Sequence, residues 1–380
     1  MKILIDENIP YAPELFSLTG EVVVIPGRLL SRGILKDADA LIVRSTTRVT
    51  ASLLTETQVK FLGTTTSGID HVDTVALADM GIKFSSAPGC NATAVVEYIF
   101  SALLTLAERD NFKLCDRTVG IVGVGNIGSC LYKRLKFLGV KTILCDPLRA
   151  NRGDKENFYS LDQLIAQVDI LTCHVPLFTK GPYKSWHLAD VSLLMGLKPY
   201  TIIINTCRGS VIDNAALLQV LSIRKDISVV LDVWEFEPNL CRDLLKKVDL
   251  ATPHIAGHTL EGKARGTVQV FDSWCKFIGQ SIHVTLENLL PIPQFNSITL
   301  HGEFDQIILK RLVHLVYDIR RDDAWLRKLS KKSDGFNYIR QRYYNRREWS
   351  SLQVICDDDD VALTLKTLGF CARSQHSSLS

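Results

Sequence analysis

The stretch TVGIVGVGNIGSCLYKRLKFLGVKTILCD, residues 118–146, constrains this chain more than any other. It opens with a short β-branched run, residues 119–122, typical of a strand buried on both faces. Gly123, Gly125 and Gly128 follow in a G-x-G-x-x-G pattern. The first glycine allows a tight turn, the second lets the backbone approach a pyrophosphate, and the third lets the helix pack close to its strand. The pattern predicts a strand, turn and helix that bind a dinucleotide.

A second strand, residues 142–145, ends in Asp146. A carboxylate at this spacing can hydrogen-bond the adenosine ribose hydroxyls and repel a 2'-phosphate, which favours NAD over NADP. Arg149 and Arg152 follow closely and could weaken that preference. A structural Rossmann-like unit without a ligand is the alternative interpretation.

The composition is that of an ordinary globular protein. Its 380 residues, 46% apolar and 22% charged, suggest two or three domains. The net charge of +3 is too small to favour a nucleic-acid or membrane partner. Asp6 and Glu7 stand where a signal peptide would need its apolar region, so we expect a cytoplasmic protein. The ten cysteines show no regular spacing and are interpreted as small buried residues rather than disulfides.

The first 95 residues alternate short apolar strands with amphipathic segments, which predicts a parallel α/β sheet. The predicted strands are residues 3–5, 22–25, 40–43, 61–63 and 82–84. Two polar loops follow strands, RSTTR at residues 44–48 and TTTSG at residues 64–68. Ligands in open α/β sheets bind beyond the carboxyl ends of strands, so these loops could hold an anionic substrate. Alternatively, their hydroxyls cap the helices that follow. Residues 91–109 then read as a long connecting helix.

Three strand ends in the second half each deliver one ionisable residue. The strands are predicted at residues 169–173, 201–205, 228–232 and 249–251, and the residues are Arg208, Glu237 and His254. Oxidation of a hydroxyl by a nicotinamide needs a base, a cation for the substrate carboxylate or carbonyl, and a group that orients the base. A histidine oriented by a carboxylate can serve as the base, and arginine binds carboxylates bidentately. Each residue could instead be structural, but together they predict a catalytic set.

His254 and His258 superficially resemble the zinc motif H-E-x-x-H. The glutamate is missing, and Pro253 and Gly257 favour a loop over the helix that would put both rings on one face. The sequence therefore predicts no metal site here.

The fingerprint, Asp146, NTCRGSVID, LDVWEFEP and PHIAGH together resemble the D-2-hydroxyacid dehydrogenase family over residues 1 to about 285. The resemblance implies an α/β fold with two doubly wound parallel-sheet lobes. The Rossmann-type NAD-binding lobe, residues 96–257, is inserted in a flavodoxin-like substrate-binding lobe, residues 1–95 and 258–286. A small α+β C-terminal dimerisation domain, residues 287–380, follows.

Further segments resemble one branch of this family along nearly the whole chain: KILIDENIPYAPELF, RSTTRVT, HVPL with GPYKSWHLAD, and LLPIPQFNSITLHG. That resemblance implies the NAD-dependent oxidation of 4-phospho-D-erythronate to 2-oxo-3-hydroxy-4-phosphobutanoate in pyridoxal 5'-phosphate (vitamin B6) biosynthesis, by a homodimeric oxidoreductase. Alternatives are another D-2-hydroxyacid dehydrogenase, such as 3-phosphoglycerate dehydrogenase, or a non-catalytic NAD-sensing protein.

The resemblance also assigns roles to residues. Arg208, Glu237 and His254 are implied to be catalytic, with His254 as the proton acceptor. Ser45, Thr66 and His258 are implied to bind the substrate. The implied cofactor contacts are Gly123, Gly125, Asn126, Ile127, Gly128, Asp146, Val175, Thr206, Cys207, Arg208, Asp232 and Gly257.

One position departs from the family pattern, because His258 stands where a tyrosine is expected. A titratable ring there could donate a hydrogen bond from a different place. The substrate phosphate also needs a cation, for which Arg44, Arg48, Lys36 and basic residues of a second subunit are candidates.

The C-terminal region is predicted to hold a helix at residues 308–328, a strand at 352–356 and a helix at 361–368. The run YIRQRYYNRR, residues 338–347, could contact nucleic acid. A solvated or interface-forming helix is the commoner interpretation, so we predict no nucleic-acid or membrane partner. The tail, residues 374–380, is expected to be disordered.

Overall fold

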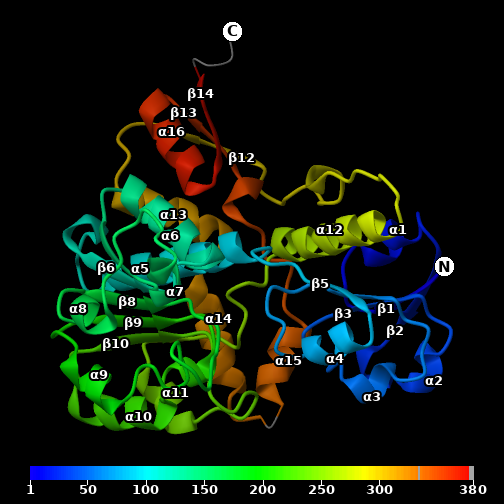
Figure 1. Cartoon of the computed structure of the whole chain (residues 1–380). Helices are drawn as coiled ribbons and strands as arrows, with labels where there is room; N and C mark the ends of the chain where they lie inside the picture. Colours follow the sequence, from blue (N-terminus) through cyan, green and yellow to red (C-terminus); the bar gives the residue numbers. More distant parts are fainter. Residues whose placement is uncertain (333, 376–380) are drawn as a thin grey trace. The chain divides into compact units, whose positions relative to one another are not determined.

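The computed structural model describes residues 1–332 and 334–375. The chain forms two compact units (Figure 1). The first comprises Met1–Asn91 and His258–Ile292, and the second Ala92–Gly257 and Pro293–Ser380.

The first unit is built on a five-stranded parallel sheet of order β2-β1-β3-β4-β5, the flavodoxin-like order. Ile3 of the central strand β1 pairs with Val22 on one side and Ala40 on the other. The strands are β1 (Lys2–Asp6), β2 (Glu21–Ile25), β3 (Ala40–Val43), β4 (Phe61–Thr64) and β5 (Lys83–Ser85). The helices are α1 (Ala12–Phe16), α2 (Arg32–Leu35), α3 (Ala51–Leu54), α4 (Thr74–Asp79) and α12 (Leu260–Phe277), with 3-10 turns η1 (Gly27–Leu29) and η4 (Leu286–Asn288).

Helix α12 returns from late in the chain and packs on this sheet beside α1 (Figure 1). A Cβ at Gly63 of β4 would lie 2.3 Å from the Cγ1 of Val270. The absence of a side chain at Gly63 therefore allows α12 to pack closely on the sheet. The fully buried Trp274 packs edge-on against Phe61 with ring centroids 5.3 Å apart. Apolar burial of this kind holds the two distant segments in one unit.

The second unit contains a six-stranded parallel sheet of order β11-β10-β9-β8-β6-β7. The order reverses between β6 and β8, which is where open α/β sheets bind ligands. The strands are β6 (Thr118–Val122), β7 (Lys141–Cys145), β8 (Ile170–Cys173), β9 (Ile202–Asn205), β10 (Ser228–Leu231) and β11 (Leu250–Ala251). The helices are α5 (Ala92–Arg109), α6 (Asn126–Phe137), α7 (Pro147–Asn151), α8 (Leu161–Ile165), α9 (Val191–Gly196), α10 (Asn214–Ile223) and α11 (Arg242–Lys247), with η2 (Leu114–Asp116) and η3 (Gly209–Val211).

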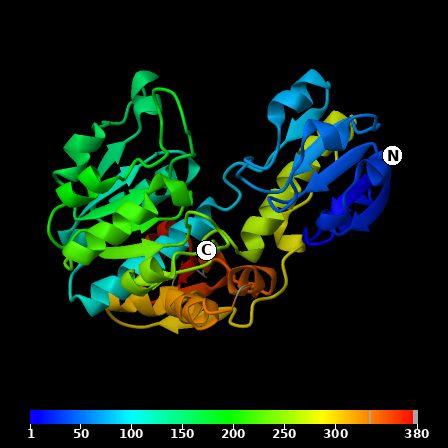
Figure 2. The same ribbon diagram turned by 90° about the horizontal axis from the view of Figure 1, so that it is seen from below.

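The C-terminal region adds a three-stranded parallel sheet of order β12-β13-β14 and four helices to the second unit. Helix α13 packs against α5, and α14 lies beside β11; Figure 2 shows α13 (orange) next to α5 (cyan). The elements are α13 (Gln306–Val316), α14 (Ile319–Leu329), α15 (Gly335–Gln341), α16 (Asp359–Leu368), β12 (Ser297–Leu300), β13 (Gln353–Cys356) and β14 (Cys371–Ser374), with η5 (Trp349–Ser351).

Two expectations for this region were wrong. The single helix at residues 308–328 is two helices, because the Asp318 side chain caps α14 by accepting the Arg320 N–H at 3.0 Å. The run at residues 338–347 is not one solvated or interface-forming helix. Helix α15 ends at Gln341, and Tyr343 and Arg346 beyond it are buried within the chain. Of the expected disordered tail, Ser374 belongs to β14, and residues 376–380 lie outside the described residues.

All ten cysteines are free thiols. No helix in the described part of the chain is both long and apolar enough to span a membrane.

Candidate active site

The three glycines of the fingerprint lie in the turn between β6 and α6, and each has a different surrounding. A Cβ at Gly123, whose φ is +88°, would lie 2.6 Å from the carbonyl oxygen of His174, and one at Gly128 would lie 2.1 Å from that of Gly123. A Cβ at Gly125 would meet nothing within 4 Å. Gly123 and Gly128 are therefore required by packing, whereas the space over Gly125 is open to a pyrophosphate. Asn126 and Ile127 form the first turn of α6, whose N-cap, Gly125, offers no capping side chain.

Asp146 lies at the end of β7 and is joined to the glycine turn. Its Oδ2 accepts the Val124 N–H at 2.8 Å, and its Oδ1 accepts the Arg149 N–H at 3.1 Å. Arg149 ion-pairs with Asp154 at 2.5 Å and donates to the carbonyl of Val124 at 3.0 Å. The half-buried carboxylate thus stands beside the turn, and the guanidinium that could have favoured NADP already binds other groups.

The turn after β9 carries Arg208 and is held by Asn205. The Asn205 side chain accepts the Cys207 N–H at 3.1 Å and donates to the carbonyl of Arg208 at 3.0 Å. A Cβ at the next residue, Gly209, would lie 2.0 Å from the carbonyl group of Trp234. Only glycine fits, so the Arg208 turn packs directly against the loop that follows β10.

The implied cofactor residues that follow β8 and β9 lie at the same carboxyl edge of the sheet. Val175 follows β8, and a Cβ at Gly123 would lie 2.8 Å from its side chain. The Thr206 hydroxyl is 3.5 Å from the Nδ1 of His174. Burial lowers the pKa of His174 to about 3, so this ring is neutral at physiological pH. His174 thus contacts the Thr206 turn, and its burial favours the neutral ring.

His254 and Glu237 form a hydrogen-bonded pair. The Nδ1 of His254 is 2.8 Å from the Oε2 of Glu237, whose Oε1 accepts the Trp234 N–H at 2.9 Å. The side chains are 36% and 21% exposed. Burial acts to raise the pKa of Glu237, but the hydrogen bond and charge of His254 outweigh it and hold this pKa below its ordinary value. The carboxylate is therefore ionised, and no described residue hydrogen-bonds to the Nε2 of His254.

Asp232 fixes the segment that carries His254. Its Oδ1 accepts the Ile255 N–H at 2.8 Å and its Oδ2 accepts the Ala256 N–H at 3.0 Å, while its carbonyl accepts the His254 N–H at 2.7 Å. Oδ1 also accepts from Thr252 at 2.6 Å. These bonds hold His254 at φ 56°, a conformation that few residues other than glycine adopt. The segment is a loop, as the sequence predicted.

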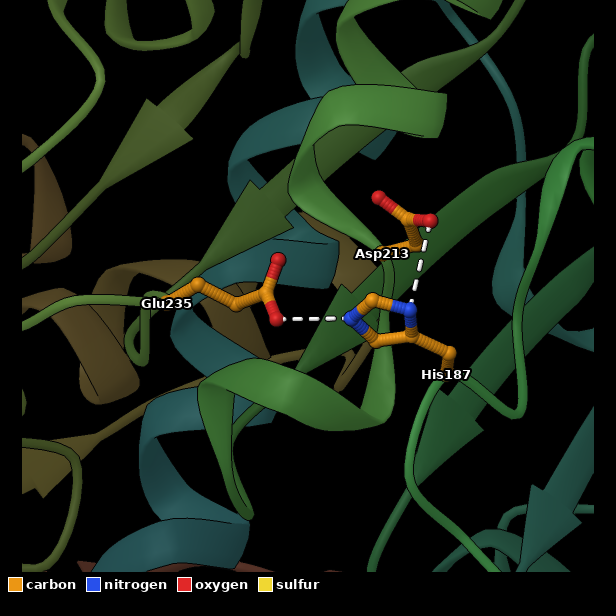
Figure 3. A group of neighbouring side chains, drawn as sticks. All are labelled: His187, Asp213 and Glu235. Atoms are coloured by element: carbon orange, nitrogen blue, oxygen red, sulfur yellow. Dashed lines mark hydrogen bonds and ion pairs between the residues drawn. The ribbon is translucent and has the colours of Figure 1, made fainter.

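His187, Asp213 and Glu235 form a second cluster, shown in Figure 3. The His187 ring lies between two carboxylates, with Nε2 2.7 Å from Glu235 and Nδ1 3.3 Å from Asp213. The ligand atoms of a metal ion converge on one point at about 2.0–2.2 Å. Here the two carboxylates lie on opposite sides of the imidazole ring, one at each nitrogen, so their oxygens do not converge with a ring nitrogen on one point. The other oxygen of Glu235 accepts the Asn214 N–H at 3.0 Å. The cluster thus ties the segment around His187 to the loop that leads to Glu237.

Three implied substrate residues lie in the first unit. Ser45 is exposed after β3, Thr66 is half-buried after β4, and His258 immediately precedes Thr259, the N-cap of α12. The Thr66 hydroxyl donates to the carbonyl of Gly68 at 3.0 Å. The polar loops do not cap the helices that follow, because Thr50 precedes α3 and Asp73 caps α4. The capping interpretation of these loops was therefore wrong.

Cations gather near the same loops. Arg44 ion-pairs with Asp6 at 3.0 Å. Lys263, on α12, was missed by the sequence analysis. Its pKa is lowered by burial and then by the positive charge of Arg44, and no carboxylate among the described residues pairs with it. Arg48 lines a neighbouring hollow of about 610 Å³ with other basic and hydroxyl side chains.

Comparisons with known proteins bear directly on this site. Residues 105–256 match the model for the D-isomer specific 2-hydroxyacid dehydrogenase NAD-binding domain, and residues 289–369 match a domain of unknown function. The chain is 62% identical to erythronate-4-phosphate dehydrogenase of Escherichia coli (strain ATCC 8739), over 98% of each chain. It is 61% identical to the enzyme of that name from Shigella flexneri serotype 5b, again over 98% of each. This chain belongs to the erythronate-4-phosphate dehydrogenase family.

Solved structures share the fold of this chain. The NAD-bound 3-phosphoglycerate dehydrogenase of Entamoeba histolytica matches with a TM-score of 0.62 and 24% identity, over 73% of this chain and 95% of that one. TT0316 protein of Thermus thermophilus has a TM-score of 0.62 and 24% identity, over 74% and 98%. The matched domain model and the 62% identity make this chain an NAD-dependent 2-hydroxyacid dehydrogenase. The predicted α/β fold class and the NAD cofactor are confirmed.

Proposed function

We propose that the chain oxidises the 2-hydroxyl of 4-phospho-D-erythronate to give 2-oxo-3-hydroxy-4-phosphobutanoate, in the synthesis of pyridoxal 5'-phosphate. The proposal is carried by the His254–Glu237 pair, which stands at the carboxyl edge of an NAD-binding sheet and engages Nδ1 while leaving Nε2 without a hydrogen bond to any described residue. It is supported by the 62% identity to a relative named for that substrate.

Bound NAD would be held by the glycine turn, Asp146 and the Arg208 turn, and it supplies the acceptor for a hydride from the 2-carbon. The open space over Gly125 fits a pyrophosphate. The chain's own contribution is proton transfer: Nε2 of neutral His254 takes the hydroxyl proton as the hydride leaves. Ionised Glu237 stabilises the imidazolium that forms, since a carboxylate beside a histidine favours its charged form.

Arg208 is proposed to bind the substrate carboxylate and polarise the reacting oxygen, because a guanidinium can bind both carboxylate oxygens. Ser45, Thr66 and His258 are proposed substrate contacts. For the phosphate we favour Lys263 with Arg44, because Lys263 is a partly buried cation without a carboxylate partner beside a second cation. A phosphate there would neutralise Lys263, while Arg44 is already paired with Asp6.

The test is NAD reduction, followed by absorbance, with 4-phospho-D-erythronate, 3-phosphoglycerate and D-lactate offered separately to purified protein. We expect turnover with the first acid and little with the others. Preference for another acid would retain the dehydrogenase and reject the substrate. NAD binding without turnover of any acid would favour an NAD-sensing protein.

A homodimer formed through residues 287–380 is also part of the proposal. Exposed apolar side chains of α13 and α15 support it: Ile307, Leu315 and Tyr338 are 59%, 42% and 43% exposed. Light scattering should give twice the chain mass for the wild type and a shift toward one chain mass for Ile307→Lys. A monomeric wild type would contradict the proposed homodimer.

Ten free thiols fit the proposed cytoplasmic location, where thiols stay reduced.

A further inference from the structure

Arg346, in the C-terminal region, is a fully buried arginine with two main-chain partners. Its Nη1 donates to the carbonyl of Ala256 at 3.1 Å, and its Nη2 donates to the carbonyl of Ala94 at 2.7 Å. Its guanidinium carbon lies 3.7 Å from the ring centroid of Tyr317. Burying a cation is costly unless it is paired, so a position that keeps one here demands a specific role.

The surroundings fix the guanidinium in place. The Tyr317 hydroxyl donates to Asp322 at 3.0 Å, and the Tyr343 hydroxyl donates to the same carboxylate at 2.5 Å. The neighbouring Trp349 is fully buried, and its main-chain N–H donates to the carboxylate of Glu97 on α5 at 2.9 Å. The Tyr317 ring, anchored through its hydroxyl, packs against the guanidinium that binds the two carbonyls.

The two carbonyls belong to the segments where the chain enters and leaves the second unit. Ala94 is in the first turn of α5, and Ala256 is two residues beyond His254. Asp232 already binds the N–H groups of this segment, including that of Ala256 at 3.0 Å. Arg346 binds the carbonyl of Ala256, so this residue is held through its N–H by Asp232 and through its C=O by Arg346.

We propose that Arg346 is a positioning residue for proton transfer: by binding Ala256 and Ala94 it holds the His254 segment so that the ring keeps its alignment with Glu237. The inference rests on the proposed role of His254. It assigns a function to the C-terminal region within its own chain, in addition to any part in dimerisation.

The test compares Arg346→Lys and Arg346→Met with Arg342→Met. Arg342 also lies over a tyrosine ring, 4.2 Å from the centroid of Tyr338, but it is exposed, so its variant controls for loss of an arginine in this region. Activity is expressed per NAD-binding site, counted by fluorescence titration, so that misfolded protein does not contribute. Thermal unfolding is recorded for each variant.

We expect kcat of Arg346→Met to fall about 100-fold, the size expected when a catalytic group is displaced by about 1 Å. Lysine keeps the charge but lacks the planar fork that binds both carbonyls, so Arg346→Lys should retain part of the activity. The Kd for NAD and the KM for 4-phospho-D-erythronate should stay within about threefold in both, and Arg342→Met should resemble the wild type.

Unchanged kcat per site in the Arg346 variants would show a merely structural residue and overturn the inference. An equal loss of kcat and NAD affinity would overturn it too, because Arg346 would then serve the cofactor site. If Arg346→Met does not fold, Arg346→Lys decides by the same criteria. His254→Gln is measured in parallel: if it keeps full turnover, the proposed role of His254 fails independently of Arg346.

Discussion

The Nδ1 of His254 lies 2.8 Å from one carboxylate oxygen of Glu237, and the other oxygen of that carboxylate is bound by a main-chain N–H. Each carboxylate oxygen of Glu237 therefore has its own hydrogen-bond partner, which restrains the carboxylate from rotating away from the ring. The imidazole is oriented through one nitrogen and left with the other for chemistry, which is the arrangement that a general base requires.

Replacing Glu237 with glutamine keeps its size but removes its charge. Because a neutral amide does not stabilise an imidazolium, we expect kcat to fall by about 100-fold. The acid limb of the pH profile of kcat/KM should move to lower pH. The pKa of Glu237 is lowered, so in the wild type the carboxylate is charged at every pH above its ordinary pKa. The stabilisation that this charge provides is lost only as the pH falls through the lowered pKa. Asp243→Asn, which changes an exposed carboxylate on α11, is the control. A Glu237→Gln profile that overlays the wild type would contradict the role.

Alanine at Gly125 should mainly weaken NAD binding, whereas alanine at Gly128 should mainly destabilise the fold. Gly125→Ala places a methyl group in open space, so the free energy of unfolding should change by less than about 1 kcal/mol while NAD affinity falls at least about tenfold. Gly128→Ala puts its Cβ against the carbonyl of Gly123 and should destabilise the fold by about 1–3 kcal/mol. Chemical denaturation and NAD titration of both proteins measure this. Equal NAD affinity for Gly125→Ala and the wild type would remove the pyrophosphate from this turn.

Asp146→Asn should weaken discrimination between the cofactors. The amide can still accept the Val124 N–H, so the turn should be retained. Loss of the charge removes the repulsion of a 2'-phosphate, and we expect the ratio of kcat/KM for NAD to that for NADP to fall about tenfold, or about 1.4 kcal/mol. Asp162→Asn, an exposed carboxylate on α8, should leave the ratio unchanged. An unchanged ratio in Asp146→Asn would mean that another group selects the cofactor.

The fold was largely predictable because its local signals are strong. Each expected strand of the two large sheets is present within a residue or two of its predicted bounds, since short β-branched runs followed by polar loops specify buried parallel strands. The glycine pattern also fixed the site of the turn. The strands β12 and β14 were not predicted, because SITL and CARS are short and mix polar with apolar residues.

The supporting residues were not predictable in the same way. Arg346 lies in a basic and aromatic run typical of exposed surfaces, and only the fold reveals that its partners are the distant Ala94 and Ala256. His187, Asp213 and Glu235 come from three separate segments and carry no spacing motif. Lys263 lies five residues after the PHIAGH motif, and the sequence does not show that it is partly buried or that the charge of Arg44 acts on it.

Lys263→Met tests the proposed phosphate site. Removing a partly buried cation should raise the KM for 4-phospho-D-erythronate by about tenfold or more, with kcat little changed, because the phosphate is remote from the reacting carbon. Lys276→Met, an exposed lysine at the end of the same helix, is the matched control. An unchanged KM would exclude Lys263 and return attention to Arg48 or to a second subunit.

Proton removal by His254 is the central step of the proposed reaction. The decisive measurement is the single-turnover rate of NAD reduction by 4-phospho-D-erythronate for the wild type and His254→Gln, with NAD affinity measured on the same samples. We predict a rate lower by about 10²–10⁴-fold in the variant at unchanged NAD affinity. A variant that reduces NAD at close to the wild-type rate would contradict the mechanism.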